Sequence, residues 1–138
     1  MWTYEYGLET TAAPETIWRL WTDVEHWGAW DSGLEKVELR GPFAVGAEIV
    51  MTPAGQEPVV MRVAELKEHE LYVDEADLGG VVVRVVHRLE PLGGGRIRVV
   101  HRAEITGPAV DTMGPQVGPA ITADFPQTVA ALVRLAES

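Results

Sequence analysis

Two histidines, His87 and His101, are the residues of this sequence whose type and spacing best suit chemistry. Each lies within a run of β-branched residues, and the two runs flank the turn Gly93-Gly94-Gly95, which together form a hairpin signature. A neutral imidazole accepts a proton at one ring nitrogen and donates one from the other, so two adjacent rings can supply an acid and a base together. Such chemistry requires that the hairpin bring the two rings side by side.

Charge predicts the register of this hairpin, which spans residues 79–108. One register places Arg84 opposite Glu104 and Glu90 opposite Arg98, and such cross-strand ion pairs stabilise a sheet. A shift by two residues in either direction pairs arginine with arginine, and a shift by one mixes the charged and apolar faces. The favoured register puts the two histidines directly opposite each other on the apolar face. A second proton is disfavoured there, because like charges repel in a poorly solvated place.

The composition indicates a single domain over residues 1–138 and limits its partners. The chain has 11 Lys and Arg against 21 Asp and Glu, a formal net charge of −10, which argues against nucleic acid or an anionic membrane surface as partner. It has no Cys, so a disulfide framework and thiolate chemistry are excluded. No apolar run reaches the length of a membrane span, and no signal peptide is recognised. We therefore expect a cytoplasmic protein without membrane insertion; the oligomeric state is left open.

Hydrophobic periodicity predicts a strand, two short helices, six further strands and one long helix. A proline at the start of the first helix and an aspartate before the second fit helix beginnings. Prolines interrupt the helical period at the end of the chain, so we expect a bend near Asp124, with Asp124 and Gln127 as a capping box. The expected ranges are strands Trp2–Thr10, Leu34–Arg40, Ala47–Thr52, Val59–Ala64, Leu71–Ala76 and the hairpin, and helices from Pro14 to Trp21, Asp23–Trp27 and Pro115–Ala136.

An antiparallel sheet must bury its apolar face, and the final helix is the only large element left to cover it. A strongly curved sheet around one helix leaves a space between the two, and Gly114 and Gly118 are expected to enlarge that space because they carry no side chain. The fold class is thus α+β, with a curved antiparallel sheet wrapped around a long C-terminal helix.

Two further groups of residues, the tryptophans and an acidic cluster, have a structural interpretation. All five Trp lie within the first thirty residues, where they form either a wall for stacking a ligand or, as we favour, anchors that hold the short helices on the sheet. The acidic residues of positions 65–77 are expected on a solvated face, because no spacing brings three ligands together with a histidine, and no metal site is predicted. The acidic group consists of Glu65, Glu68, Glu70, Asp74, Glu75 and Asp77.

In this order of elements the sequence resembles the START-like (SRPBCC) superfamily, and its polyketide cyclase/dehydrase and lipid-transport branch most closely. The residues that carry the resemblance are Ala13–Asp31, Gly41–Phe43, Gly46, His87–Pro91 and His101–Pro108. The resemblance covers nearly the whole chain and implies a helix-grip fold with an internal cavity between the sheet and the last helix. It implies no cofactor and no shared catalytic motif. The prolines of the last helix depart from the pattern.

The first functional hypothesis is a bacterial protein that binds a hydrophobic or aromatic small molecule, lipid-like or polyketide-like, in that cavity. Apolar side chains would form most of its wall, and a few polar groups would orient the ligand. A packed core without a ligand is the alternative for each of these residues. The expected lining consists of Met61, Tyr72, Val83, Val85, His87, Val99, His101, Met113, Val117, Ile121 and Phe125.

Two further hypotheses remain open. In the second, the chain is a polyketide cyclase or dehydratase, in which His87 and His101 act as base and acid; no third residue is visibly placed to orient either ring. In the third, it is an interaction module of the co-chaperone type. Either the region Trp27–Trp30 or the outer sheet face, with its row of arginines from Arg84 to Arg102, would then bind another protein. A solvated sheet face explains the arginine row as well.

Overall fold

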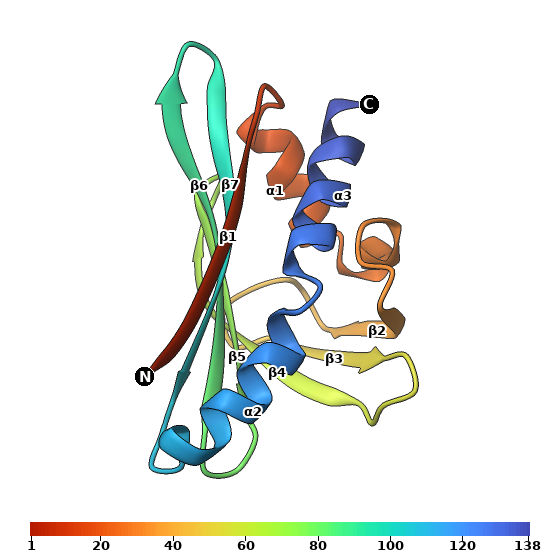
Figure 1. Cartoon of the computed structure of the whole chain (residues 1–138). Helices are drawn as coiled ribbons and strands as arrows, with labels where there is room; N and C mark the ends of the chain where they lie inside the picture. Colours follow the sequence, from red (N-terminus) through yellow and green to blue (C-terminus); the bar gives the residue numbers. More distant parts are fainter.

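The computed structural model describes all 138 residues and consists of one curved antiparallel sheet with helices on its concave face (Figure 1). The seven strands lie in the order β1-β7-β6-β5-β4-β3-β2, so β1 and β2 are the two edges. This is the expected helix-grip arrangement. The strands are β1 (Trp2–Thr10), β2 (Leu34–Arg40), β3 (Glu48–Pro53), β4 (Val59–Lys67), β5 (Leu71–Asp77), β6 (Val82–Gly93) and β7 (Arg96–Thr106).

The helices fall into two groups along the chain. Helix α1 (Pro14–Thr22) and the 3₁₀ helix η1 (Val24–Ala29) connect β1 to β2. Proline at the first position of α1 suits a helix start because its missing N–H would be unpaired there anyway. Helices α2 (Val110–Thr122) and α3 (Phe125–Glu137) follow β7 and cover the sheet. None of the helices is both long enough and apolar enough to cross a bilayer.

The hairpin β6–β7 has the predicted register. Arg84 pairs with Glu104, and Glu90 with Arg98, in the strand ladder. Their side chains lie 3.7 Å and 3.4 Å apart respectively, which confirms the charge argument.

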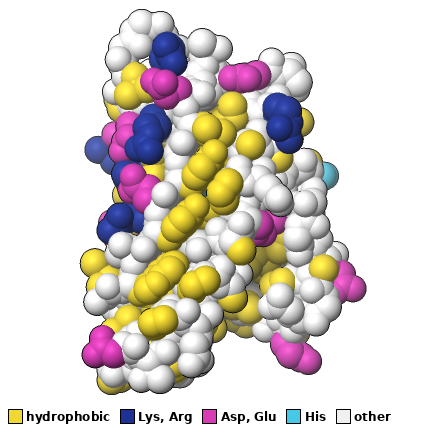
Figure 2. All heavy atoms as spheres, viewed as in Figure 1, with side chains coloured by type: hydrophobic (Ala, Val, Ile, Leu, Met, Phe, Trp, Pro, Cys, Tyr) yellow, Lys and Arg dark blue, Asp and Glu magenta, His cyan; other side chains and the backbone are white.

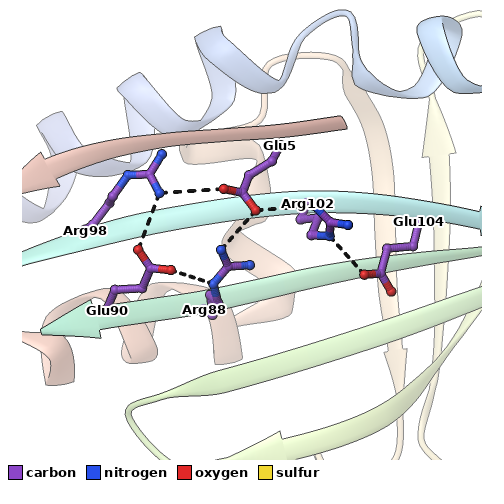
Figure 3. Close-up of polar contacts among 6 residues, drawn as sticks. All are labelled: Glu5, Arg88, Glu90, Arg98, Arg102 and Glu104. Atoms are coloured by element: carbon purple, nitrogen blue, oxygen red, sulfur yellow. Dashed lines mark hydrogen bonds and ion pairs between the residues drawn. The ribbon is translucent and has the colours of Figure 1, made fainter. Parts of the chain in front are cut away.

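These pairs belong to a larger ionic network on the outer face of the sheet (Figure 3). Glu5 of β1 lies at its centre, 2.9 Å from Arg88 and 3.6 Å from both Arg98 and Arg102. The network therefore links three neighbouring strands, β1, β7 and β6.

The C-terminal helix differs from the prediction in its start and in its break. It begins at Val110, earlier than expected, and it is interrupted at residues 123–124, where the bend was predicted. The side chain of Asp124 makes no cap hydrogen bond, so the predicted capping box is absent. Pro115 and Pro119 both lie inside α2. They are exposed, so water can reach the carbonyls that lose their partners, and the helix continues through both.

The two glycines of α2 do not enlarge a cavity, which corrects the expectation. The indole of Trp2 packs directly on them: a Cβ at Gly118 would lie 2.5 Å from its ring, and a Cβ at Gly114 would lie 3.2 Å from the Cβ of Trp2. The glycines therefore allow close contact between α2 and β1. Figure 2 shows hydrophobic side chains gathered in a diagonal band on the face that carries β1 and these helices in this view.

Candidate functional site

The hairpin brings the two histidines together in the core, as predicted. His87 and His101 are paired across β6 and β7, their ring centroids lie 4.7 Å apart, and they are only 7% and 3% exposed. Burial lowers the pKa of His87 to about 4. Burial and the neighbouring His87 hold the pKa of His101 well below its usual value. Both rings are therefore neutral at neutral pH.

Hydrogen bonds define which nitrogen of each ring carries the proton. His87 donates from Nδ1 to the carbonyl of Tyr72 at 2.9 Å, which leaves its Nε2 as an acceptor. His101 accepts at Nε2 from the indole N–H of Trp21 at 3.2 Å, which leaves its Nδ1–H as a donor. The pair thus presents one acceptor and one donor.

These two remaining nitrogens have no hydrogen-bond partner within the chain. No fully buried side-chain nitrogen or oxygen in the structure lacks a hydrogen-bond partner. His87 Nε2 and His101 Nδ1 are therefore not fully enclosed by protein atoms, and they border space that a water molecule can reach. The site offers an unpaired acceptor and an unpaired donor within the core.

Tyr72 and Asp74 of β5 extend this polar cluster. The Tyr72 ring stacks on His87 with centroids 4.4 Å apart, and its hydroxyl donates to the Asp74 carboxylate. Burial raises the pKa of Asp74 to about 7, against the lowering effect of that hydrogen bond. Burial, followed by the charge of Asp74, raises the pKa of Tyr72 well above its usual value.

The prediction of a solvated face was wrong for Asp74, which is only 3% exposed. The physical reason is the alternation of a strand, in which residues two apart point to the same side. Tyr72 was expected to face the core, so Asp74 had to face it as well. The sequence therefore contained the signal for this buried carboxylate.

Trp21 is the second residue of the site that the sequence did not indicate. It is fully buried, and its ring lies 5.7 Å from His87 and 5.9 Å from His101 between centroids. Together with its hydrogen bond to His101, this contact supplies the orienting group that was missing from the hairpin alone. Three tryptophans, Trp21, Trp27 and Trp30, belong to the main hydrophobic core, as the packing interpretation favoured.

The predicted lining residues lie in two groups along the concave face. The larger core contains Met61, Tyr72 and Val99, beneath α1 and α3. A second cluster lies beneath α2: Val83 is buried there, and Val85, Met113, Val117 and Ile121 pack against it. Phe125 is buried between the two, with its ring 6.1 Å from that of His101. The histidine pair is the polar point between these apolar groups.

Most of the predicted lining residues lie outside the walls of two hollows in the structure. The first, of about 450 Å³, is lined by both charged and apolar residues of β3 to β6, and Met61 is the only predicted lining residue in it. The second, of about 470 Å³, lies between the η1–β2 segment and α3. Trp30 contributes to its wall and also contacts the ring of His101, at 6.2 Å between centroids.

The arginine row on the outer face is engaged within the chain itself. Arg84 contacts Glu65, Glu75 and Glu104, and Arg96 lies 3.0 Å from Glu9. The other three arginines belong to the network around Glu5. Each positive charge of the row is balanced locally, so the row offers little unpaired charge to a partner protein.

The curved seven-stranded sheet and the C-terminal helices form the helix-grip fold of the START-like class. The family model described as polyketide cyclase/dehydrase and lipid transport matches residues 1–137. The chain therefore belongs to this family, as the sequence resemblance implied. No curated protein matches the chain.

Several solved structures share the fold at low sequence identity. Norcoclaurine synthase from Thalictrum flavum superposes with a TM-score of 0.77 at 18% identity, covering 99% of this chain and 86% of that chain. The protein XoxI from Bacillus cereus gives a TM-score of 0.78 at 12% identity, covering 100% and 97%. The di-domain aromatase/cyclase BexL gives 0.76 at 17% identity, covering 99% of this chain and 47% of that one. At these identities the likeness concerns the fold alone.

Proposed function

We propose that this chain binds a hydrophobic or aromatic small molecule that carries a hydroxyl or carbonyl oxygen, lipid-like or polyketide-like, between the sheet and the C-terminal helices. One observation carries the proposal: an unpaired acceptor, His87 Nε2, lies beside an unpaired donor, His101 Nδ1, within the apolar core. A pocket of this kind gains affinity from apolar burial and selectivity from a few polar groups.

Apolar burial and hydrogen bonding contribute differently to the free energy of binding. Burial of apolar surface contributes about 25 cal/mol per Å² whatever the ligand's polar groups. A single neutral hydrogen bond contributes about 1 kcal/mol net, which corresponds to about a fivefold preference for a ligand that can make it. The apolar walls are therefore expected to set the affinity, and the histidine pair to select an oxygenated ligand.

The family and its structural neighbours support this function. The family description includes lipid transport beside cyclases and dehydrases. Norcoclaurine synthase, which shares the fold, was solved with dopamine and hydroxybenzaldehyde bound. Both of those molecules are small aromatic compounds that carry oxygen functions.

Native mass spectrometry of the freshly purified chain tests whether an apolar molecule co-purifies, and organic extraction identifies its class. Selectivity is tested by comparing 2-naphthol with naphthalene, which differ only in the hydroxyl. We expect the wild type to prefer 2-naphthol by about fivefold. The variant His87→Ala with His101→Ala should bind both and lose the preference. If neither compound binds and no molecule co-purifies, the proposal is wrong.

A second candidate function is catalysis by a polyketide cyclase or dehydratase. The complementary proton positions of His87 and His101 favour it, because one ring can accept a proton while the other donates. Their low pKa values count against it, because an efficient general base has a pKa near the working pH. Binding is therefore better supported than catalysis. Turnover of a poly-β-keto substrate that falls about 100-fold or more on loss of either ring would favour the enzyme.

A further inference from the structure

The hollow between the η1–β2 segment and α3 separates two parts of the chain that share no hydrogen bond or ion pair. One side is formed by Gly28, Ala29, Trp30, Ser32 and Gly33, and Thr128, Ala131 and Arg134 of α3 lie on the other. Figure 1 shows the η1–β2 segment beside α3. No hydrogen bond or ion pair joins residues 24–40 to α3. We call this boundary the η1–α3 seam.

Trp30 lies where the η1–α3 seam meets the histidine pair. Its side chain lines the hollow, is 6% exposed, and has its ring 6.2 Å from that of His101. The indole N–H of Trp27 is fixed by a hydrogen bond to the carbonyl of Trp21 at 2.9 Å. The indole of Trp30 has no such bond, so packing alone holds it in place.

The carboxylates of Asp31 and Asp124 both lie close to Gly33 at the rim of the seam. A Cβ at Gly33 would lie 3.2 Å from Asp124 Oδ2 and 3.6 Å from Asp31 Oδ1. Burial, with the nearby Asp124 as the second cause, raises the pKa of Asp31 to about 6. Asp31 is therefore largely ionised at neutral pH, and its repulsion by the nearby Asp124 carboxylate opposes tight closure of the rim.

We propose that the η1–α3 seam is the opening through which a small molecule reaches the histidine pair, and that Trp30 is the side chain that must move to admit it. The inference rests on the proposed binding function and adds its route. Asp124 and Arg134 are the charged residues in the wall of the seam. The hollow beside β4 and β5 is a poorer route, because its wall includes four charged side chains, Glu48, Arg62, Glu75 and Asp77. An apolar molecule would have to pass those charges.

The absence of cysteine from the chain allows the seam to be locked reversibly. In the variant Gly33→Cys with Asp124→Cys, the two thiols lie across the rim. Gly33 has no positive φ, so its backbone accepts a side chain. Its Cβ position lies 3.2 Å from Asp124 Oδ2, which places the two residues next to each other at the rim. The probe is N-phenyl-1-naphthylamine, a neutral apolar dye, followed by stopped-flow fluorescence during binding and release.

We expect the oxidised variant to bind and release the dye about tenfold more slowly, or slower still, than its reduced form, with a similar Kd, because a gate changes rates and not end states. The matched variant Gly33→Ser with Asp124→Ser removes the same acid without a disulfide, and it should exchange at the reduced rate. Equal rates in the oxidised and reduced forms would overturn the route.

A second variant covers the case in which the disulfide does not form. Ala131→Cys places a single thiol in the seam, and Leu92→Cys places one at the exposed end of β6. A bulky maleimide at position 131 should slow dye exchange, and the same reagent at position 92 should not. If labelling at the two positions has equal effects, the seam is not the route. If wild type, reduced and oxidised chains all fail to bind any dye, the binding function itself is wrong.

Discussion

Replacing Asp74 by Asn should stabilise the folded chain increasingly as the pH rises from about 4 to about 8. The pKa of Asp74 is about 7 in the folded chain against an ordinary value of 3.8, and each pKa unit corresponds to about 1.4 kcal/mol. Ionised Asp74 therefore costs the folded state about 4 kcal/mol relative to the unfolded chain. Asn has almost the same shape, carries no charge, and can still accept the hydrogen bond from the Tyr72 hydroxyl.

The sign follows from proton binding in the two states. Between pH 4 and pH 7 the folded chain holds the Asp74 proton and the unfolded chain has released it, so the stability that this group contributes falls as the pH rises. His87 and His101 act in the opposite direction below pH 6.5, because their pKa values are lowered. Their effect is the same in wild type and variant, so it cancels in the difference.

Urea unfolding of both proteins at several pH values measures that difference. We expect the free energy of unfolding of Asp74→Asn, minus that of the wild type, to rise by about 1.4 kcal/mol per pH unit. The difference should level off above pH 7, near 4 kcal/mol. The control is Asp77→Asn, the same chemical change at an exposed carboxylate on the same strand, which tests whether the effect is specific to the buried position. A difference that stays constant from pH 5 to pH 8 would refute the assignment of Asp74 as a buried, destabilising carboxylate.

Two further predictions concern the packing of β1. Gly118→Ala should lower the free energy of unfolding by about 1–3 kcal/mol in chemical denaturation, because the new Cβ would lie 2.5 Å from the Trp2 ring. The control Gly28→Ala, where nothing lies within 4 Å of the new Cβ, should change stability by about 0.5 kcal/mol at most. Equal costs for the two variants would contradict the close contact. Glu5→Gln should cost about 1 kcal/mol or less, and the loss should shrink in about 1 M salt, which screens the network; a loss independent of salt would mean that Glu5 contributes by packing.

The sheet could be predicted closely because its information is local. The register of the β6–β7 hairpin follows from the positions of Arg84, Glu90, Arg98 and Glu104, since only one alignment separates the like charges. That alignment also fixed the contact between the two histidines. Strand ends such as Trp2–Thr10 follow from the alternation of aromatic and polar residues.

The surroundings of the histidine pair could not be derived from such patterns. Trp21 reaches His101 because α1 docks on the sheet at one particular rotation and height, and the amphipathic pattern of a helix fixes only which face is buried. Trp2 packs directly against Gly114 and Gly118 because α2 crosses β1 at a short distance. The two glycines allow this short distance, but it could not be predicted from them. Pairing within a strand ladder is encoded locally, whereas docking of one element on another is not.

The most direct test of the binding function is histidine side-chain ¹⁵N NMR during a titration with 2-naphthol. The chain has 4 His, and His26 and His69 serve as internal controls, because their side chains are 77% and 38% exposed. We predict that ligand addition shifts the nitrogens of His87 and His101 and leaves those of His26 and His69 unchanged. Binding that leaves the buried pair unchanged, or no binding at all, would contradict the proposal.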